Sequence, residues 1–160
     1  MTLDKHQEMG DTGKMRMIGL DIGSQTIGVA ISDELGVTAQ ALKTIRRRSK
    51  QEDLQELSSL ISQFEIGKIV VGLPLNMDGS QGKQAERVLA WCETLQQTLQ
   101  IPVVTWDERL TTVSASKILL EADLSRKKRK KVIDQVAAAI ILQGYLDQSR
   151  NPDYDPYRSA

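Results

Sequence analysis

Three acidic residues occupy the positions in this sequence that are best suited to chemistry. Asp21 follows an apolar run that begins at Met17, and Glu108 closely follows a second run that ends at Trp106. Asp134 interrupts the stretch VIDQVAAAIIL, whose composition predicts a helix that is apolar nearly all round. Burying a carboxylate in such a stretch is costly unless another group pairs with it. All three acids therefore call for a functional or structural partner.

Carboxylates are the ligands that Mg²⁺ and Mn²⁺ take in proteins, usually together with the phosphates of a substrate. Two such ions can stabilise both the attacking and the leaving oxygen of an in-line displacement, and one of them activates the water. Spacing alone leaves another interpretation open, since acidic residues also lie in turns and in the first turns of helices. The acids predict a phosphate-directed metal site without excluding structural roles.

Composition excludes several other chemistries. His6 is the only histidine among 160 residues, which excludes a Ser-His-Asp triad, a Cys-His pair and a histidine zinc site. Cys92 is the only cysteine, so no internal disulfide can form, and its place on an apolar helix face predicts burial. No apolar run approaches the roughly 20 residues of a membrane span, and the N-terminus lacks a signal peptide pattern. We expect a cytoplasmic protein without a membrane partner.

The acids must be positioned by an alternation of strands and helices. We expect a β-hairpin within 17–33 and further strands at 37–45, 68–72 and 101–106. Four helices are predicted. The first begins at a capping box formed by Ser49 and Glu52 and ends at Gly67, and the others span 85–95, 115–122 and Ser125 to about Leu146. This order predicts an α/β fold whose mixed central sheet has antiparallel strands first, then parallel strands, with helices on both faces.

The chain is expected to form one domain. Residues 1–14 are polar and lack periodicity, which predicts a disordered tail, and the proline-containing residues 149–160 predict an irregular one. The domain itself is expected to span 15–148.

Positive charge is concentrated in two patches, although 21 basic and 21 acidic residues give a net charge of +0. The first patch comprises Arg46, Arg47, Arg48 and Lys50, and the second comprises Arg126, Lys127, Lys128, Arg129, Lys130 and Lys131. The second patch lies shortly before Asp134, which favours contact with phosphates leading toward the acids over a merely solvated helix face. For the first patch the two interpretations stay open.

Four motifs in order resemble the YqgF/RuvX family of ribonuclease H-like nucleases. They are GLDIG…IGVAISD, VVGLPLNMDGSQG, DERLTT and RKKRKKVIDQVAAAIILQGYLD. Together they cover the chain from Met17 to about Asp147. The family is associated with processing of pre-16S rRNA and is related to Holliday junction resolvases.

The resemblance implies a ribonuclease H-like fold in which Asp21, Glu108 and Asp134 bind Mg²⁺ or Mn²⁺. It implies that the loop from Leu73 to Gly82 and the residues after Glu108 help to position nucleic acid; the candidates are Asn76, Arg109, Thr111 and Thr112. One departure is Gln25, followed by Thr26, where many relatives carry a basic residue, so the resemblance does not carry a phosphate contact over to this turn.

The implied activity is hydrolysis of phosphodiester bonds in structured nucleic acid, at the 5′ end of pre-16S rRNA during ribosome biogenesis or in branched DNA. Ribosomal precursor particles are then expected partners, and the protein is expected to be a monomer or weak dimer.

Two alternatives come from other functional classes. The segment DIGSQTIGVA also resembles the first phosphate loop of actin, sugar kinases and Hsp70-type chaperones, but those proteins enclose ATP between two lobes and this chain has room for one. The other alternative is a module that binds ribosomal RNA without cutting it, which the three acids disfavour.

Overall fold

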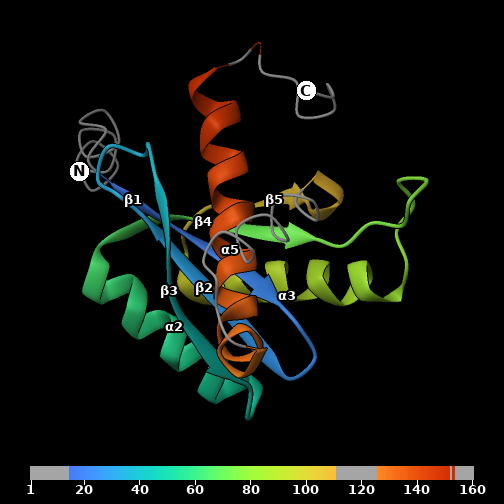
Figure 1. The fold of residues 1–160 in the computed structure, drawn as a ribbon. Coiled ribbons are helices and arrows are strands. Elements are labelled where there is room, and N and C mark those ends of the chain that lie inside the picture. Colours follow the sequence, from blue (N-terminus) through green and yellow to red (C-terminus); the bar gives the residue numbers. More distant parts are fainter. Residues whose placement is uncertain (1–14, 111–125, 152, 154–160) are drawn as a thin grey trace.

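The computed structural model describes residues 15–110, 126–151 and 153, with residues 110 and 126–132 described by their backbone alone. The strands are β1 (Arg16–Ile22), β2 (Thr26–Ser32), β3 (Ala39–Arg46), β4 (Ile66–Leu73) and β5 (Val103–Asp107). The helices are α2 (Lys50–Phe64), α3 (Lys83–Leu99), the 3-10 turn η1 (Glu108–Leu110) and α5 (Arg126–Arg150) (Figure 1).

The five strands form one sheet in the order β3-β2-β1-β4-β5. The pairs β1–β2 and β2–β3 are antiparallel, whereas β1–β4 and β4–β5 are parallel. This confirms the predicted α/β class with its mixed sheet. Because β1, β3, β4 and β5 run in the same direction, their carboxyl ends meet at one end of the sheet, where β2 begins.

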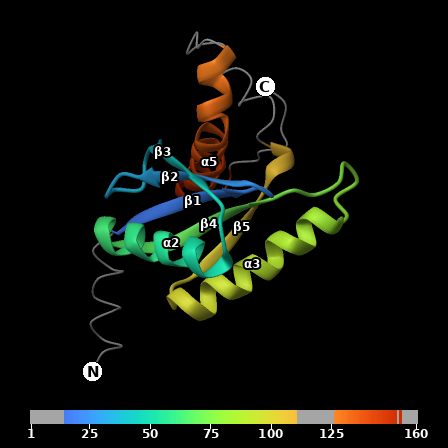
Figure 2. The same ribbon diagram turned by 90° about the horizontal axis from the view of Figure 1, so that it is seen from below.

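The sheet is the middle of three layers. Helix α5 crosses one face, and α2 and α3 cover the other (Figure 2). Alternate strand residues serve the two layers: Ile18 and Val29 pack in the core beneath α2 and α3, whereas Ala30 and Val70 pack against α5. Each side chain of these four is fully buried, so the central strands are covered on both faces of the sheet.

Helix α2 begins as predicted but ends earlier. The Ser49 hydroxyl accepts a hydrogen bond from the Glu52 backbone N–H at 3.1 Å and caps the first turn. The predicted end at Gly67 is wrong, because Glu65 takes a left-handed conformation with φ of 54° and its N–H bonds the Ile61 carbonyl. The chain then enters β4 directly, and Gly67 is part of that strand.

The remaining element bounds differ from the prediction near their ends. β3 and β5 begin at Ala39 and Val103, later than expected, and α5 continues to Arg150 instead of ending near Leu146. Leu146 is buried and the Arg150 guanidinium donates to the Val37 carbonyl at 3.5 Å, so the last turns of α5 keep tertiary contacts. The helix predicted at 115–122, the tail at 1–14 and most of 149–160 lie outside the described residues.

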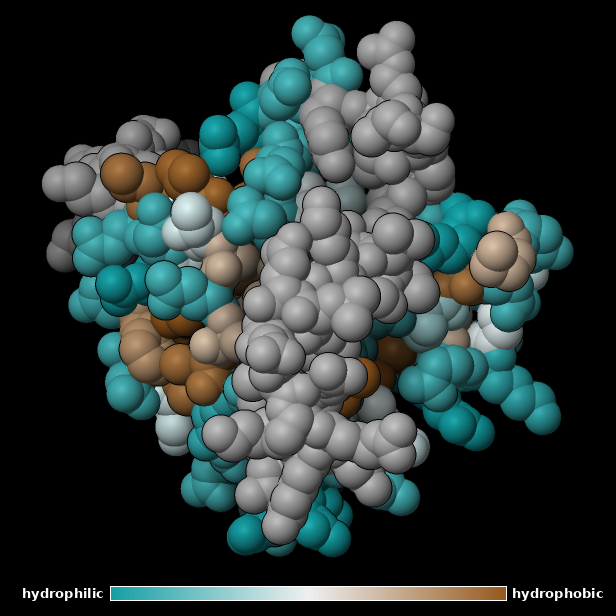
Figure 3. All heavy atoms as spheres, viewed as in Figure 1, coloured by the Kyte–Doolittle hydropathy of each residue, from teal (hydrophilic) through white to brown (hydrophobic). Residues whose placement is uncertain are grey.

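The visible surface outside the grey atoms of Figure 3 is mainly hydrophilic, with separate apolar areas. None of the helices in the described part of the chain combines the length and apolarity needed to cross a membrane. Cys92 is half-buried against the core, and burial raises the pKa of its thiol to about 11. Such a thiol is almost entirely protonated at neutral pH, which agrees with the packing role expected for it.

Candidate active site

The candidate site lies where the carboxyl ends of β1 and β5 meet. Asp21 is near the end of β1 and pairs with Gly28 of β2, while Glu108 follows the last residue of β5. Strand β4 separates β1 from β5 in the sheet. A contact between Asp21 and Glu108 therefore requires the Glu108 side chain to pass over β4.

Gly72 of β4 provides the room for this crossing. A Cβ atom at this position would lie 2.8 Å from both Cγ and Oε1 of Glu108, and it would also overlap Ile141 of α5. Any side chain here would displace Glu108 or the helix. Because Gly72 has none, Glu108 reaches Asp21 and the two carboxyl groups share a hydrogen bond.

Burial and neighbouring negative charge favour a proton on the hydrogen-bonded pair. Burial raises the pKa of Glu108 to about 8, and the hydrogen bond and charge of Asp21, with the charge of Asp107, add to the effect. Burial also raises the pKa of Asp21, as does the charge of Asp134, while the hydrogen bond with Glu108 opposes the rise. The pair therefore holds a proton near neutral pH, which removes one of two like charges in a poorly solvated place.

Asp134 is brought to the same end of the sheet by a close approach of α5 to β2. A Cβ atom on Gly28 would overlap the backbone carbonyl oxygen of Asp134, so only glycine allows the helix to lie this close. The Thr26 hydroxyl donates to Asp134 Oδ2 at 2.6 Å and orients the carboxylate. This contact explains how an acid within an apolar helix is satisfied.

Thr26 was missed by sequence reasoning. It is the polar first residue of a mostly apolar strand, TIGVAIS, and its position next to a glycine turn is the only signal in the sequence. Its partner lies 108 residues away, so the pairing depends on the tertiary fold.

The donor set fits a divalent cation in its chemistry. Among the residues whose side chains are described, no three acidic, histidine or cysteine side chains form a complete metal-binding group as they stand. Asp21 and Glu108 are nevertheless hydrogen-bonded, and Asp134 is near enough to raise the pKa of Asp21. Three carboxylates on three elements provide the oxygen ligands that Mg²⁺ and Mn²⁺ take.

Arg109 braces the neighbouring loop. Its Nε lies 3.0 Å and its Nη2 2.6 Å from Asp107 Oδ2, and its Nη1 donates to the Met77 carbonyl at 3.2 Å. The guanidinium thus ties the end of β5 to the loop between β4 and α3. The predicted role of Arg109 in positioning nucleic acid remains a prediction, and these contacts give it a structural role as well.

The loop from β4 to α3 has a defined conformation. The Asn76 amide donates to Ser80 Oγ at 3.0 Å, and Asp78 accepts hydrogen bonds from the backbone and hydroxyl of Ser80. Those hydrogen bonds lower the pKa of Asp78, so it stays ionised. Gly79 has a φ of 87°, which favours glycine in the turn. Asn76 is exposed at the sheet end that carries the acids.

Several predicted contact residues fall where side chains are not described. Thr111 and Thr112 lie outside the described residues. The basic run of Arg126, Lys127, Lys128, Arg129, Lys130 and Lys131 forms the first turns of α5, and Asp134 follows it on the same helix. Its backbone therefore leads toward the acids.

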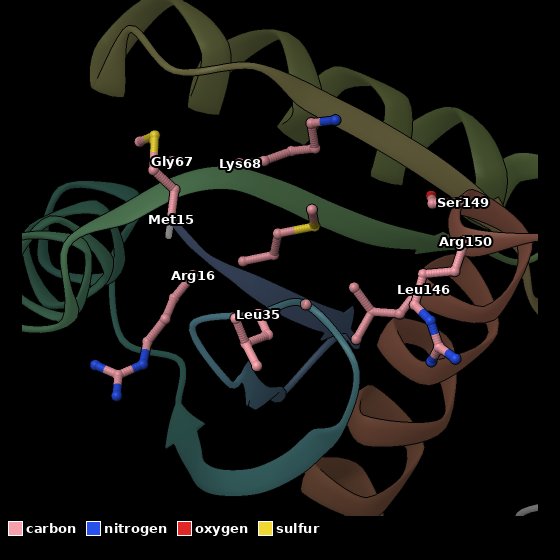
Figure 4. A pocket seen from close by; sticks show the side chains of 10 residues that line it. Met15, Arg16, Leu35, Gly67, Lys68, Leu146, Ser149 and Arg150 are labelled. Atoms are coloured by element: carbon pink, nitrogen blue, oxygen red, sulfur yellow. The ribbon is translucent and has the colours of Figure 1, made fainter. Parts of the chain in front are cut away.

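A cavity of about 410 Å³ lies at the opposite end of the sheet (Figure 4). Arg16, Lys68 and Arg150 line it together with apolar residues such as Leu146. It contains no carboxylate and lies beside the starts of β1 and β4, so it takes no part in the chemistry proposed for the acids.

Comparisons with known proteins agree with this architecture. The model of a family described as RuvX, Holliday junction resolvase, matches residues 15–148. A protein of Clostridium acetobutylicum named "Putative pre-16S rRNA nuclease" is 56% identical over 133 residues, which are 83% of this chain and 98% of that relative.

Two solved structures share the fold at low identity. Thermus thermophilus RuvC in complex with a Holliday junction substrate has a TM-score of 0.51 at 16% identity, covering 85% of this chain and 96% of RuvC. The fowlpox virus Holliday junction resolvase has a TM-score of 0.53 at 10% identity, covering 84% and 99% of the two chains. The family match and the close relative together decide the classification: this chain belongs to the RuvX family.

Proposed function

We propose that this protein is a divalent-metal-dependent nuclease whose metal ligands are Asp21, Glu108 and Asp134. The observation that supports this most is the buried, hydrogen-bonded pair of Asp21 and Glu108 with Asp134 close to it. A like-charged cluster is unfavourable in a folded protein unless a cation or a substrate uses it. Family membership supplies the reaction class, since the matching family is described as a resolvase and the close relative as a nuclease.

When bound, Mg²⁺ or Mn²⁺ would lower the pKa of an attacking water and neutralise charge on the phosphate. The protein residues prepare for this in distinct ways. Asp21 and Glu108 would hold the ion as a pair of carboxylates, once their shared proton is released to the solvent. Thr26 holds one oxygen of Asp134 and thereby fixes the orientation of the other. Arg109 keeps the loop that carries Asn76 in place through its bond to Met77.

The proposed substrate is pre-16S rRNA, because the relative with 56% identity carries that substrate in its name; cleavage near the 5′ end is what the family resemblance implies. Branched DNA is the second candidate, supported by a shared fold with RuvC bound to a Holliday junction. Action on rRNA would place the protein in the cytoplasm with ribosomal precursor particles, as a monomer or weak dimer.

The test compares two substrates under matched conditions. A precursor 16S rRNA fragment and a four-way DNA junction are incubated with the protein, with and without Mn²⁺. The expected result is cleavage of the rRNA precursor near its 5′ end, and only with the metal. Cleavage of the junction alone would transfer the assignment to branched DNA.

Asp21→Asn and Asp153→Asn form a matched pair of variants. Asp153 is an exposed aspartate after α5, so its replacement controls for the loss of one negative charge. Asp21→Asn is expected to bind substrate without cutting it, whereas Asp153→Asn keeps full activity. A fully active Asp21→Asn protein would contradict the proposed site, and binding without cleavage by the unaltered protein would favour the RNA-binding alternative.

A further inference from the structure

A groove between α2 and α3 lies on the sheet face opposite α5, where the two helices run side by side (Figure 2). It encloses about 340 Å³ between the first turn of α2 and the middle of α3. The residues that line it are Arg47, Lys50, Arg87, Ala90, Trp91 and Thr94.

The groove is linked to the active end of the molecule through Arg47. Its Nη1 donates to the Gly23 carbonyl at 2.6 Å, and its backbone N–H donates to the Gln25 carbonyl at 2.9 Å. Gly23 is only two residues beyond Asp21 in the β1–β2 turn. Arg47 therefore connects one end of the groove to the turn that follows a proposed metal ligand.

The charge in this groove is only partly compensated within the described part of the chain. No acidic residue lines it, and Arg47 is the only one of its three cations that makes an ion pair among the described residues, with Asp53 at 3.4 Å. Lys50 and Arg87 are exposed. The neighbouring depression around Arg46 and Arg48 differs, since Glu52 and Glu56 line it and Glu52 lies 3.8 Å from Arg48. Within the first basic patch, the positive charge available to a ligand is therefore mainly that of Lys50, in the groove.

The wall of the groove is apolar and aromatic. Trp91 and Ala90 form it, and the Arg47 guanidinium lies 4.9 Å from the centre of the Trp91 ring. Cations beside an aromatic surface suit the phosphates and unstacked bases of a single strand. A duplex keeps its bases stacked inside and can offer only its phosphates to such a wall.

We infer that the groove binds a single-stranded segment of the substrate that flanks the bond to be cut, with phosphates at Lys50 and Arg87 and a base against Trp91. The inference rests on the proposed nuclease function and specifies the form of its substrate: a single strand must extend from the scissile bond across the β1–β2 turn.

Trp91 provides a direct readout, because the only other tryptophan is Trp106. Trp106→Phe leaves Trp91 as the sole indole, and the change removes a buried Nε1 that has no hydrogen-bond partner within the described structure. This variant is titrated in EDTA, which prevents cleavage, with a single-stranded oligoribonucleotide and with a blunt duplex of the same sequence. We expect saturable quenching by the single strand and little change with the duplex. Trp91→Phe, which keeps Trp106, should lose the signal.

The double variant Lys50→Gln, Arg87→Gln tests the phosphate contacts. Each contact to a single strand contributes about 0.7 to the slope of log affinity against log salt, so the loss of two should lower the slope by about 1.4. In cleavage assays the substrate KM should rise while kcat stays within about twofold, because these residues hold substrate without touching the reacting atoms. The matched control is Arg16→Gln, Lys68→Gln at the far cavity, which should change neither quantity.

The outcomes separate this inference from the proposed function. An oligonucleotide that binds without changing Trp91 emission, an unchanged salt slope in the double variant, or equal quenching by the duplex would each overturn the inference while cleavage stands. Conversely, Trp91 quenching by a protein that never cuts with Mn²⁺ would support the groove and contradict the nuclease. Each variant must melt at the same temperature as the unaltered protein. Loss of the quenching signal in Trp91→Phe tests the inference independently of Trp106→Phe.

Discussion

Among the acids whose side chains the structure describes, Glu108 has a strongly raised pKa. Its pKa in the folded protein is about 8, compared with an ordinary value of 4.5. Between these values the folded state binds a proton that the unfolded state releases. Folding is therefore favoured at low pH and becomes less favourable as the pH rises through this window.

We predict that the free energy of unfolding of the metal-free protein falls as the pH rises from about 4.5 to about 8. Glu108→Gln should flatten much of this fall, because a neutral amide replaces the group that titrates. Urea unfolding in EDTA at several pH values measures both proteins, and Glu93→Gln, an exposed change on α3, is the control. Equal pH dependence in the Glu108 and Glu93 variants would show that Glu108 is not the responsible group.

The β1–β2 turn is held in place indirectly by Asp53, a buried aspartate of α2 that lies outside the candidate active site. Asp53 is 2% exposed, and its carboxylate accepts hydrogen bonds from Arg47 Nε at 3.4 Å and from the Arg48 backbone N–H at 3.1 Å. Arg47 in turn holds the Gly23 carbonyl. The first turn of α2 thus supports the turn that follows Asp21.

We predict that Asp53→Ala lowers the free energy of unfolding by about 3 kcal/mol, since it leaves Arg47 and the Arg48 N–H without their partner. Glu56→Ala is the matched control, because it removes an exposed ion pair with Lys43 and should cost less than about 1 kcal/mol. Chemical denaturation of both variants measures the difference. Similar losses in the two proteins would contradict a supporting role for Asp53.

The close contact between α5 and β2 can be tested by adding a methyl group to Gly28 and, as a control, to Gly67. Gly28→Ala should force Asp134 away from the sheet, cost about 1–3 kcal/mol in overpacking and abolish cleavage. Gly67→Ala is a suitable control in β4, because the added methyl meets only the flexible side chain of Met15. Denaturation and cleavage assays distinguish them, and an active Gly28→Ala protein would contradict the required close approach.

Hydrophobic periodicity was sufficient to predict most elements and to place Asp21 and Glu108 near the ends of strands. It could not show that β4 lies between β1 and β5, so the passage of Glu108 over Gly72 was not predictable. The helix end at Glu65 was also missed, because a non-glycine residue takes the left-handed conformation there. Long-range partners such as Thr26 and Asp134 depend on packing that a local pattern does not contain.

At the scale of the molecule, the two basic patches of the sequence both lie toward the end of the sheet that carries the acids, while Arg16, Lys68 and Arg150 lie at the other end. Arg46, Lys50 and the first turns of α5 belong to this end, where β1, β3 and β5 finish. A protein with no net charge can attract a polyanion in one orientation if its positive charge is placed in this way. We propose that the domain at 15–148 contains all residues needed for this binding.

We predict that changing Lys127, Lys128 and Lys130 to Gln weakens RNA binding uniformly across sequences, since phosphate contacts carry no base information. The salt slope should fall by about 2 to 3, at 0.7 to 0.9 for each lost contact. Fluorescence anisotropy at several salt concentrations measures it. An unchanged slope would mean that this run is a solvated helix surface.

The close fit of α5 on the sheet also governs when the protein becomes competent during synthesis. Asp134 belongs to the last described helix, and the same helix covers Ala30 and Val70, which belong to strands made much earlier. A growing chain on the ribosome therefore has Asp21 and Glu108 but lacks the third acid and one wall of its core. If its substrate is ribosomal RNA, the order of its elements delays cutting until α5 has been synthesised and can pack on the sheet.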